Sequence, residues 1–410
     1  MNARATPISI TEPAPAPHPF WSGAFRPLFL CAGILAIVAV VWWVASVAHG
    51  IAAPGLGTGS WWHAHEMIFG FGGAAIGGFL LTAIANWTGR PPISGPMLMA
   101  LTASWIIARL SIGFSDELPL VVTLCGALGY FVFLLALGLR ELVAARNYRN
   151  MRVLAVIAMI TLFDGLFIAA CLDGIALDPA IIYQTAILTI ILLIGLIGGR
   201  VIPAFTRNWM QREAIAAPMP AMFDRFDMIC LGSIVAGIVA LILDPFGSMS
   251  GYMLMLAGGL HLIRLIRWRG IYSWREPIVA MLHLGYVWVP VGLFLLGASI
   301  LWPENLNSRD ALHALTSGAM ACMVLAIAGR AALGHTGREL RAGVALNSAF
   351  ALIWLSTVLR VVVGFAEAEY IVILAVATLM WIGGWLAFLI GYGRVLLGPS
   401  QKKTRGIPVR

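Results

Sequence analysis

The sequence predicts an all-α polytopic membrane protein with a bundle of about 12 transmembrane helices and both termini in the cytoplasm. Of the 410 residues, 60% are hydrophobic and 11% are charged, whereas a soluble domain carries about 25% charged residues. The apolar runs approach the roughly 20 residues that a helix needs to cross a bilayer, and they are far longer than the strands of a membrane barrel. The basic residues gather in alternate gaps between these runs, which is typical of cytoplasmic loops.

The first six helices are delimited by charges, glycines and prolines. We expect them at residues 27–48, 63–86, 94–113, 118–140, 152–172 and 179–199. The second begins at His63 and ends before the string TGRPP, whose double proline cannot continue a helix. The fourth ends at Arg140, and the sixth lies between Asp178 and Arg200.

The remaining six helices are expected at residues 226–243, 249–268, 277–301, 310–330, 342–365 and 369–394. The longest gap, 200–225, contains a candidate amphipathic stretch around TRNWMQRE. Together the helices form one transmembrane domain, residues 27–395. We expect residues 1–26, which are polar and rich in proline, to be a disordered cytoplasmic tail, and residues 396–410 to be a basic cytoplasmic tail.

The orientation follows from the charges in the gaps. Arginines occupy the even-numbered gaps, whereas acidic residues dominate the odd-numbered ones, with Arg309 as the exception. By the positive-inside rule the even-numbered gaps and both ends of the chain are cytoplasmic.

The composition also excludes several functions. The net charge of +8 arises from arginines between membrane helices, so it indicates topology and not a nucleic-acid partner. The five cysteines are isolated within apolar runs, and no CxxC or CxxCH string occurs. Disulfides, iron–sulfur clusters and covalently attached haem are therefore not expected. No apolar segment of a cleavable signal peptide occurs in the first 20 residues.

The stretch from Trp61 to Gly95, which begins WWHAHEMIFGF, organises the chain. Ionisable residues at the mouth of a membrane helix are costly and usually functional. The helix that follows is rich in small residues: Gly70, Ala74 and Gly78 recur every four positions, and so do Gly73 and Gly77. Such stripes let another backbone, or the flat face of a macrocycle, approach closely.

The predicted topology divides the histidines between the two faces. His63 and His65 open the second helix and His313 opens the tenth, all on the outer side. His261 and His283 lie near the inner ends of the eighth and ninth helices. Because neutral imidazole ligates haem iron and copper, each group is a candidate set of metal and cofactor ligands. The alternative is that these rings only bond carbonyl groups at helix ends.

Two further features concern the inner side. His261, Arg264 and Trp268 share one helix face by their spacing, which either caps a cofactor or anchors the helix at the interface. His335 falls in a hydrated cytoplasmic gap and is not expected to bind metal.

Two arginines lie within predicted membrane helices near the outer face. Arg109 and Arg360 each need an anionic partner there. The candidates on the chain are Glu66, Asp310 and Asp164; haem propionates are the alternative, because a guanidinium group binds carboxylates through two parallel hydrogen bonds.

Copper could be bound by the outer histidines or by sulfur. Met320, Cys322 and Met323 cluster on the tenth helix, and thioethers and thiols suit Cu(I). His63 and His65 are two residues apart and would point apart on a regular helix. They serve one metal only if His63 lies in the loop before the helix.

Several strings together resemble the NnrS family: WHAHEMxFGF, GFLLTAxxNWTGRPP, GGRVIPAFTRN, LHLGYVW, LHALTSGAM and GRAALGHTGR, all in order along the chain. The resemblance implies a multi-pass protein of the bacterial inner membrane that binds haem b non-covalently and copper. It also implies a role in the response to nitric oxide and nitrosative stress, in which the protein protects metal centres or handles species derived from nitric oxide.

Two other functions stay open at this point. Twelve helices with buried charges also suit a transporter, although the histidines at the helix ends do not outline a central substrate site. A quinol-linked membrane redox enzyme is the other alternative, which rests on analogy of fold alone. The sequence does not decide whether the protein is an enzyme.

Overall fold

A computed structural model describes residues 18–365 and 369–401, and the regular structure in these ranges is entirely helical. Twelve helical spans are long and apolar enough to cross a membrane, so the predicted all-α bundle of about 12 transmembrane helices is confirmed. The cytoplasmic position of both termini stays a prediction. The parts of the predicted tails at residues 1–17 and 402–410 lie outside the described residues. The first six spans are α1 Phe25–His49; α2 Gly59–His65, η2 Glu66–Phe71 and α3 Gly72–Thr88 as one span; α4 Gly95–Gly113; α5 Leu120–Ala144; α6 Met151–Cys171, preceded by η3 Tyr148–Asn150; and α7 Pro179–Arg212.

The other six spans complete the bundle. They are α8 Arg225–Leu243; α9 Ser248–Arg267; α10 Pro277–Tyr286 with α11 Trp288–Leu301; α12 Ser308–His313, η5 Ala314–Met320 and α13 Ala321–Gly334; α14 Val344–Val362 with η6 Val363–Phe365; and α15 Tyr370–Leu397. Short 3-10 turns also occur at η1 Pro19–Trp21 and η4 Gly270–Ser273.

Several helix boundaries differ from the prediction by a few residues, and two of the differences bear on the site or have a clear local cause. The second span begins at Gly59, because the Thr58 side chain accepts a hydrogen bond from the backbone of Trp61 and caps the helix there. His63 therefore lies within the helix and not in a loop. The sixth helix, predicted to end at residue 199, continues to Arg212 through Pro203. Half-buried Arg200 bonds Asn150 and therefore does not end the span.

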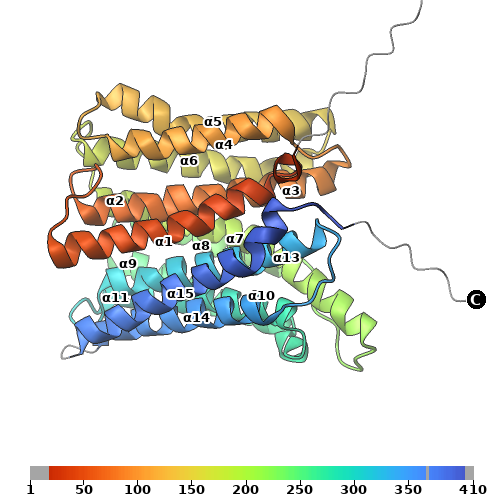
Figure 1. Ribbon diagram of the computed structural model, residues 1–410. Helices are drawn as coiled ribbons and strands as arrows, with labels where there is room; N and C mark the ends of the chain where they lie inside the picture. The colour runs from red at the N-terminus through yellow and green to blue at the C-terminus, as the bar shows by residue number, and fades with distance from the viewer. Residues whose placement is uncertain (1–17, 366–368, 402–410) are drawn as a thin grey trace, which may run out of the picture.

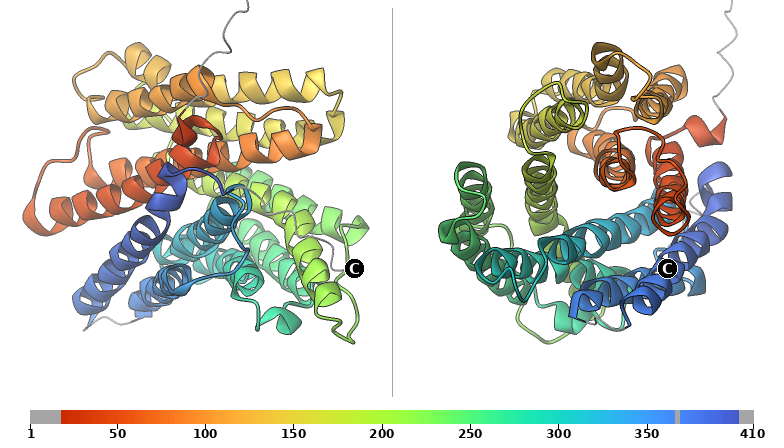
Figure 2. Two further views of the ribbon diagram at one scale, coloured as in Figure 1. Left: turned by 45° about the vertical axis from the view of Figure 1, so that its right-hand side comes forward. Right: turned by 90° about the vertical axis from the view of Figure 1, so that its left-hand side faces the viewer.

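The helices enclose a centre formed by the two spans that carry the predicted outer histidines. Contacts link α4 to α5, α5 to α6, and so on in chain order to α9, then α9 to α11, α14 to α15, and α15 to α1; Figures 1 and 2 show this arrangement along and across the bundle. The spans Gly59–Thr88 and Ser308–Gly334 are the most buried of the twelve, at 78% and 72% of their apolar windows. Their side chains therefore face other helices more than lipid.

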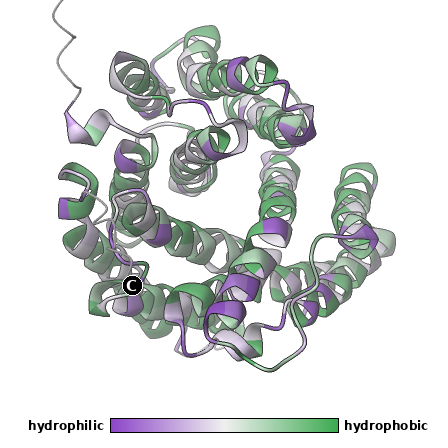
Figure 3. Ribbon diagram, turned by 90° about the vertical axis from the view of Figure 1, so that its right-hand side faces the viewer, coloured by the Kyte–Doolittle hydropathy of each residue, from purple (hydrophilic) through white to green (hydrophobic). Residues whose placement is uncertain are grey.

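Both ends of the described chain meet at one face of the bundle, which we call the terminal face; the opposite one is the distal face. The guanidinium group of Arg26 donates hydrogen bonds to the carbonyls of Leu396 and Gly398 and to the Ser400 hydroxyl. Figure 3 looks onto the terminal face and shows hydrophilic residues at helix ends and loops, with hydrophobic residues along the helices. By the arginine distribution the terminal face is the predicted cytoplasmic one.

The small residues of α3 and η2 permit close packing, but side chains fill the space that they leave. A Cβ added at Gly70 would overlap Arg109 Nη1, and one added at Gly77 would overlap the hydroxyl of Tyr130. That hydroxyl donates a 2.9 Å hydrogen bond to the carbonyl of Gly73. Within the described residues, the stripe therefore serves helix packing around polar side chains.

This packing makes Gly77→Ala a destabilising substitution. We expect a loss of about 1–3 kcal/mol in unfolding free energy, because the added methyl group displaces Tyr130 in a tightly packed region. Thermal unfolding of the detergent-solubilised protein measures it. Gly129→Ala in α5 is the matched control, since its Cβ would meet nothing within 4 Å. Equal melting temperatures for the two variants would contradict this account.

Candidate metal site

The two spans that carry the distal histidines share an unusual backbone feature. Directly after His65, the helix widens into a π-helical segment, η2, and directly after His313 it widens into another, η5. π-helical turns inside α-helices are rare and are frequently found at functional sites. Two of them, each following a histidine in the most buried helices, mark this region as the candidate site.

His63 and His313 line the same pocket at the distal end of the bundle. The pocket has a volume of about 80 Å³ and lies between α1, the second span, the tenth span, α14 and α15. The ring of Trp43 packs 5.1 Å from that of His63 and also lines the pocket. The structure thus brings together two of the three predicted outer histidines.

Both rings can offer a lone pair. The Nδ1 of His313 lies 2.7 Å from the carbonyl oxygen of Arg309. Because a carbonyl only accepts, Nδ1 carries the proton and Nε2 keeps its lone pair. The Nδ1 of His63 is buried and has no hydrogen-bond partner among the described residues. A histidine whose other ring nitrogen bonds a backbone carbonyl is the usual arrangement of a metal ligand.

Sulfur and a guanidinium group complete the pocket. Met67 and Met320 line it together with the histidines. Arg360 lines it as well and is paired with Asp310, Nη1 to Oδ1 at 2.5 Å. This is one of the arginine–carboxylate pairs that the sequence indicated.

His65 points away from this pocket into a buried ionic network. Its Nδ1 lies 3.1 Å from Glu66 Oε1, and its Nε2 lies 2.8 Å from Asp164 Oδ1. Glu66 Oε2 accepts a 3.3 Å bond from Arg109 Nη1. His65 and Asp164 are 0% exposed and Glu66 is 2% exposed.

The network balances its charge if His65 is protonated. A carboxylate only accepts hydrogen bonds, so a ring between two carboxylates is best satisfied as an imidazolium ion that donates from both nitrogens. Two cationic and two anionic groups then neutralise one another, as buried charges require. In this arrangement His65 offers no lone pair to a metal, so its predicted ligand role lacks support from the geometry. The expectation that His63 and His65 would point apart agrees with the structure.

The histidines near the terminal end occupy separate environments. His261 bonds Tyr286 through Nδ1, at 2.8 Å, and the carbonyl of Cys230 through Nε2, at 3.0 Å. Arg264 completes this buried cluster through a 2.7 Å bond to Asp227 and a 2.9 Å bond to Tyr286. Both nitrogens of His261 are therefore engaged, and its helix face serves as a polar anchor between α8, α9 and α10.

His283 has one free nitrogen but little space. Its Nε2 lies 2.8 Å from the hydroxyl of Thr206, and that hydroxyl donates to the carbonyl of Ile202. Nε2 is thus the donor, and the buried Nδ1 has no partner in the described chain. Gly270 packs directly against this Nδ1, so a bound group would have to displace that turn.

The donor set of the distal pocket is small. In the ranges 18–365 and 369–401, no three His, Cys, Asp or Glu side chains gather in a group that could hold a metal ion. Cys322 is buried and faces the carbonyl of Ser317 at 3.9 Å; it does not line the pocket. Two imidazoles and two thioethers are the available ligands there.

Comparison with known proteins supports the identification. The family model described as NnrS protein matches residues 19–400, which is nearly the whole chain. The chain belongs to the NnrS family. No curated protein matches it. Family membership supports a membrane protein of the nitric oxide response, and the twelve spans make it a multi-pass membrane protein.

The strings that resemble the NnrS family coincide with the polar features of the bundle. WHAHEM supplies both His63 and the His65 network, and LHALTSGAM supplies His313 and Met320. Sequence reasoning did not single out Thr206 or Tyr286 as histidine partners, although both occur within quoted strings, GGRVIPAFTRN and LHLGYVW. The hydroxyl groups of Thr206 and Tyr286 lie in otherwise apolar helices, and a buried hydroxyl group needs a hydrogen-bond partner. This requirement could have indicated both residues as partners of a histidine.

Proposed function

We propose that this NnrS family member is a protein of the bacterial inner membrane that binds copper through His63 and His313 in the response to nitric oxide, and that it also binds haem b non-covalently. The arrangement of these two rings carries the copper proposal. They come from different spans, line one pocket and present ring nitrogens without protein partners.

The donor chemistry fits copper better than harder metals. Imidazole and thioether ligands suit Cu(I), whereas carboxylate and carbonyl oxygens suit Mg²⁺ and Ca²⁺. Asp310 forms a salt bridge with Arg360, which lines the pocket. The two thioethers beside the imidazoles favour the softer ion, Cu(I), over Cu(II).

Haem does not fit the distal pocket. Cofactor pockets have volumes of about 300–1,000 Å³, whereas this one has about 80 Å³. A metal ion and a diatomic molecule suit a space of this size better than a porphyrin does. His65 and His261 have both ring nitrogens engaged. We therefore propose that haem b binds outside the distal pocket and without His65 or His261 as ligands.

The pocket suits a small ligand that reaches copper through the bilayer. When bound, copper would supply a site for coordination of nitric oxide. Met320 lines both this pocket and a central pocket whose lining residues are all apolar, and an uncharged diatomic molecule is compatible with such a lining. Arg360 provides a hydrogen-bond donor at the wall of the site.

Cofactor analysis of the purified protein tests the proposal. We expect about one copper per chain by elemental analysis and haem b in the pyridine haemochrome spectrum. Addition of nitric oxide to the reduced protein under anaerobic conditions should change the spectrum of the copper- and haem-loaded sample. A folded protein that binds neither cofactor after reconstitution would refute the proposal.

A further inference from the structure

A large cavity opens near the terminal face, far from the histidine pocket. It has a volume of about 430 Å³, and its walls come from α1, α3, α7, α13 and the loop that follows α13. A second compartment of about 310 Å³ adjoins it and shares Thr82, Asn86 and His335. The cavity alone falls within the usual size range of small-molecule and cofactor sites.

The cavity contains an arginine that forms no salt bridge among the described residues. Arg330 of α13 stacks on Phe205 of α7, with its guanidinium carbon 3.5 Å from the ring centroid. Among the residues that the structure describes, none of those lining either compartment is acidic. The other arginine there, Arg90, is already paired with Glu141 at 2.5 Å.

An arginine in a membrane helix normally has an anionic partner. Among the described residues Arg330 has direct contact with the ring of Phe205, and the nearby acid Glu276 is already paired with Arg212. Stacking on an aromatic ring contributes about 0.5–2 kcal/mol, which is small compared with the desolvation cost of an ion. Arg330 leaves its planar set of donors available for a bidentate oxyanion, such as a carboxylate or a phosphate. The charge of the site therefore indicates an anionic ligand.

Other polar groups surround the same space. The side chains of Asn86 and His335 line both compartments. Burial lowers the pKa of His335 from its usual value, so the ring is neutral at pH 7 and can donate one hydrogen bond or offer one lone pair. His335 follows the last residue of α13 and is exposed at the edge of the cavity, as expected for a residue of the gap after this helix.

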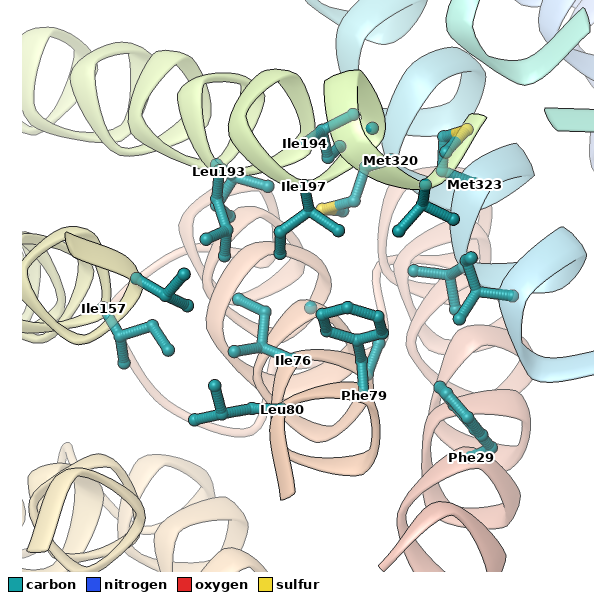
Figure 4. A pocket seen from close by; sticks show the side chains of 18 residues that line it. Phe29, Ile76, Phe79, Leu80, Ile157, Leu193, Ile194, Ile197, Met320 and Met323 are labelled. Atoms are coloured by element: carbon teal, nitrogen blue, oxygen red, sulfur yellow. The ribbon is translucent and has the colours of Figure 1, made fainter. Parts of the chain in front are cut away.

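The side of the cavity that adjoins the central pocket is lined by apolar residues. Phe29, Phe79, Val201 and Ile327 line both this cavity and the central pocket. Figure 4 shows the central pocket with apolar side chains pointing into it, including Ile76, Ile197 and the thioethers of Met320 and Met323. A ligand with its charge at Arg330 would thus meet an apolar surface deeper in the bundle.

We propose that the cavity at the terminal face binds an amphiphile whose head group carries an oxyanion. The oxyanion binds Arg330 near Asn86 and His335, and the apolar part lies between α3, α7 and α13. Two sources carry this chemistry: the phosphate of a membrane phospholipid and the carboxylates of a haem. The site is independent of the histidine pocket, so it can exist whether or not copper binds there.

The test is ligand retention by the full-length purified protein. Wild type, Arg330→Gln and the matched control Arg341→Gln, an exposed arginine that does not line the cavity, are washed in detergent. Bound phospholipid is then measured by native mass spectrometry and haem by the pyridine haemochrome. Wild type and Arg341→Gln should retain about one amphiphile per chain, and Arg330→Gln should lose it by about tenfold or more, as expected when one member of a buried charge pair is removed.

The two sources give different results. Loss of the phospholipid alone identifies a lipid phosphate, and loss of haem alone identifies carboxylates. Should Arg330→Gln fail to fold, Ala331→Phe, which fills the cavity and keeps the arginine, must show the same loss. Wild type without a retained amphiphile, or full retention in folded Arg330→Gln, would overturn the proposal.

Discussion

Replacement of either pocket histidine by alanine should remove copper from the purified protein and leave the bundle folded. His63→Ala and His313→Ala each delete one of two imidazoles that line the pocket from different spans. With one imidazole and two thioethers left, we expect copper occupancy to fall by about 10–100-fold, as for a lost ligand or its supporting group. Elemental analysis after dialysis against a fixed concentration of free copper measures it.

Two controls separate coordination from general damage. His49→Ala removes an exposed histidine at the end of α1 on the same face, and it should keep its copper. Size-exclusion profiles and melting temperatures of apo-protein should agree for all three variants, because both pocket rings are only partly buried. Normal copper content in folded His63→Ala and His313→Ala would exclude the pocket as the copper site.

The sulfur ligands make a smaller and distinct contribution. Met320→Leu preserves volume and apolar character but removes the thioether. We expect it to weaken Cu(I) binding by several-fold and to leave Cu(II) binding nearly unchanged, because thioethers prefer the softer ion. Competition titrations with chelators specific for each oxidation state check this. Met323 lines the central pocket but not the distal pocket, so Met323→Leu serves as the matched control.

The sequence was sufficient to predict the fold because long apolar runs and arginine-rich gaps both depend on the bilayer alone. The exceptions have local causes. The predicted end at residue 199 treated Arg200 as a stop, whereas the structure continues the helix and buries Ile202, Thr206 and Met210 beyond it. The early start at Gly59 depends on the Thr58 cap, which an apolar count does not register.

The site was predictable only in part, because it depends on contacts between distant spans. The spacing of His63 and His65 correctly indicated divergent rings, but it could not show which ring faces His313. The partner of His65, Asp164, lies 99 residues away on α6; a lone acid in an apolar helix was its only signal. Neither the two π-helical segments nor the unpaired state of Arg330 is visible from periodicity.

The ionic network around His65 leads to the prediction with the largest expected effect on stability. Asp164→Ala removes a fully buried carboxylate and leaves the ring of His65 with one partner. Removal of one partner of a buried ion pair typically lowers the free energy of unfolding by about 3–5 kcal/mol. We expect a much lower melting temperature and a poor yield of folded protein, measured by fluorescence-detected size-exclusion chromatography.

Replacement of both His65 and Asp164 should lower the free energy of unfolding by less than the sum of the two single replacements. In the double variant His65→Leu/Asp164→Leu both members of one charge pair are gone, while Glu66 keeps its partner Arg109. Replacement of a buried ion pair by apolar residues often leaves stability unchanged. A double-mutant cycle therefore gives a coupling energy of about 1–3 kcal/mol. Asp173→Asn, an exposed change just after the same helix, should stay within about 0.5 kcal/mol of wild type.

The same variants decide between the two roles of His65. As a structural cation, His65 contributes to stability, so the folded fraction of His65→Leu/Asp164→Leu should still bind copper through His63 and His313. As a metal ligand, its loss would abolish cofactor binding in protein that remains well folded. The geometry supports the first outcome, because each ring nitrogen of His65 is already bonded to a carboxylate, while the ring nitrogens available for coordination lie across the helix at the distal pocket.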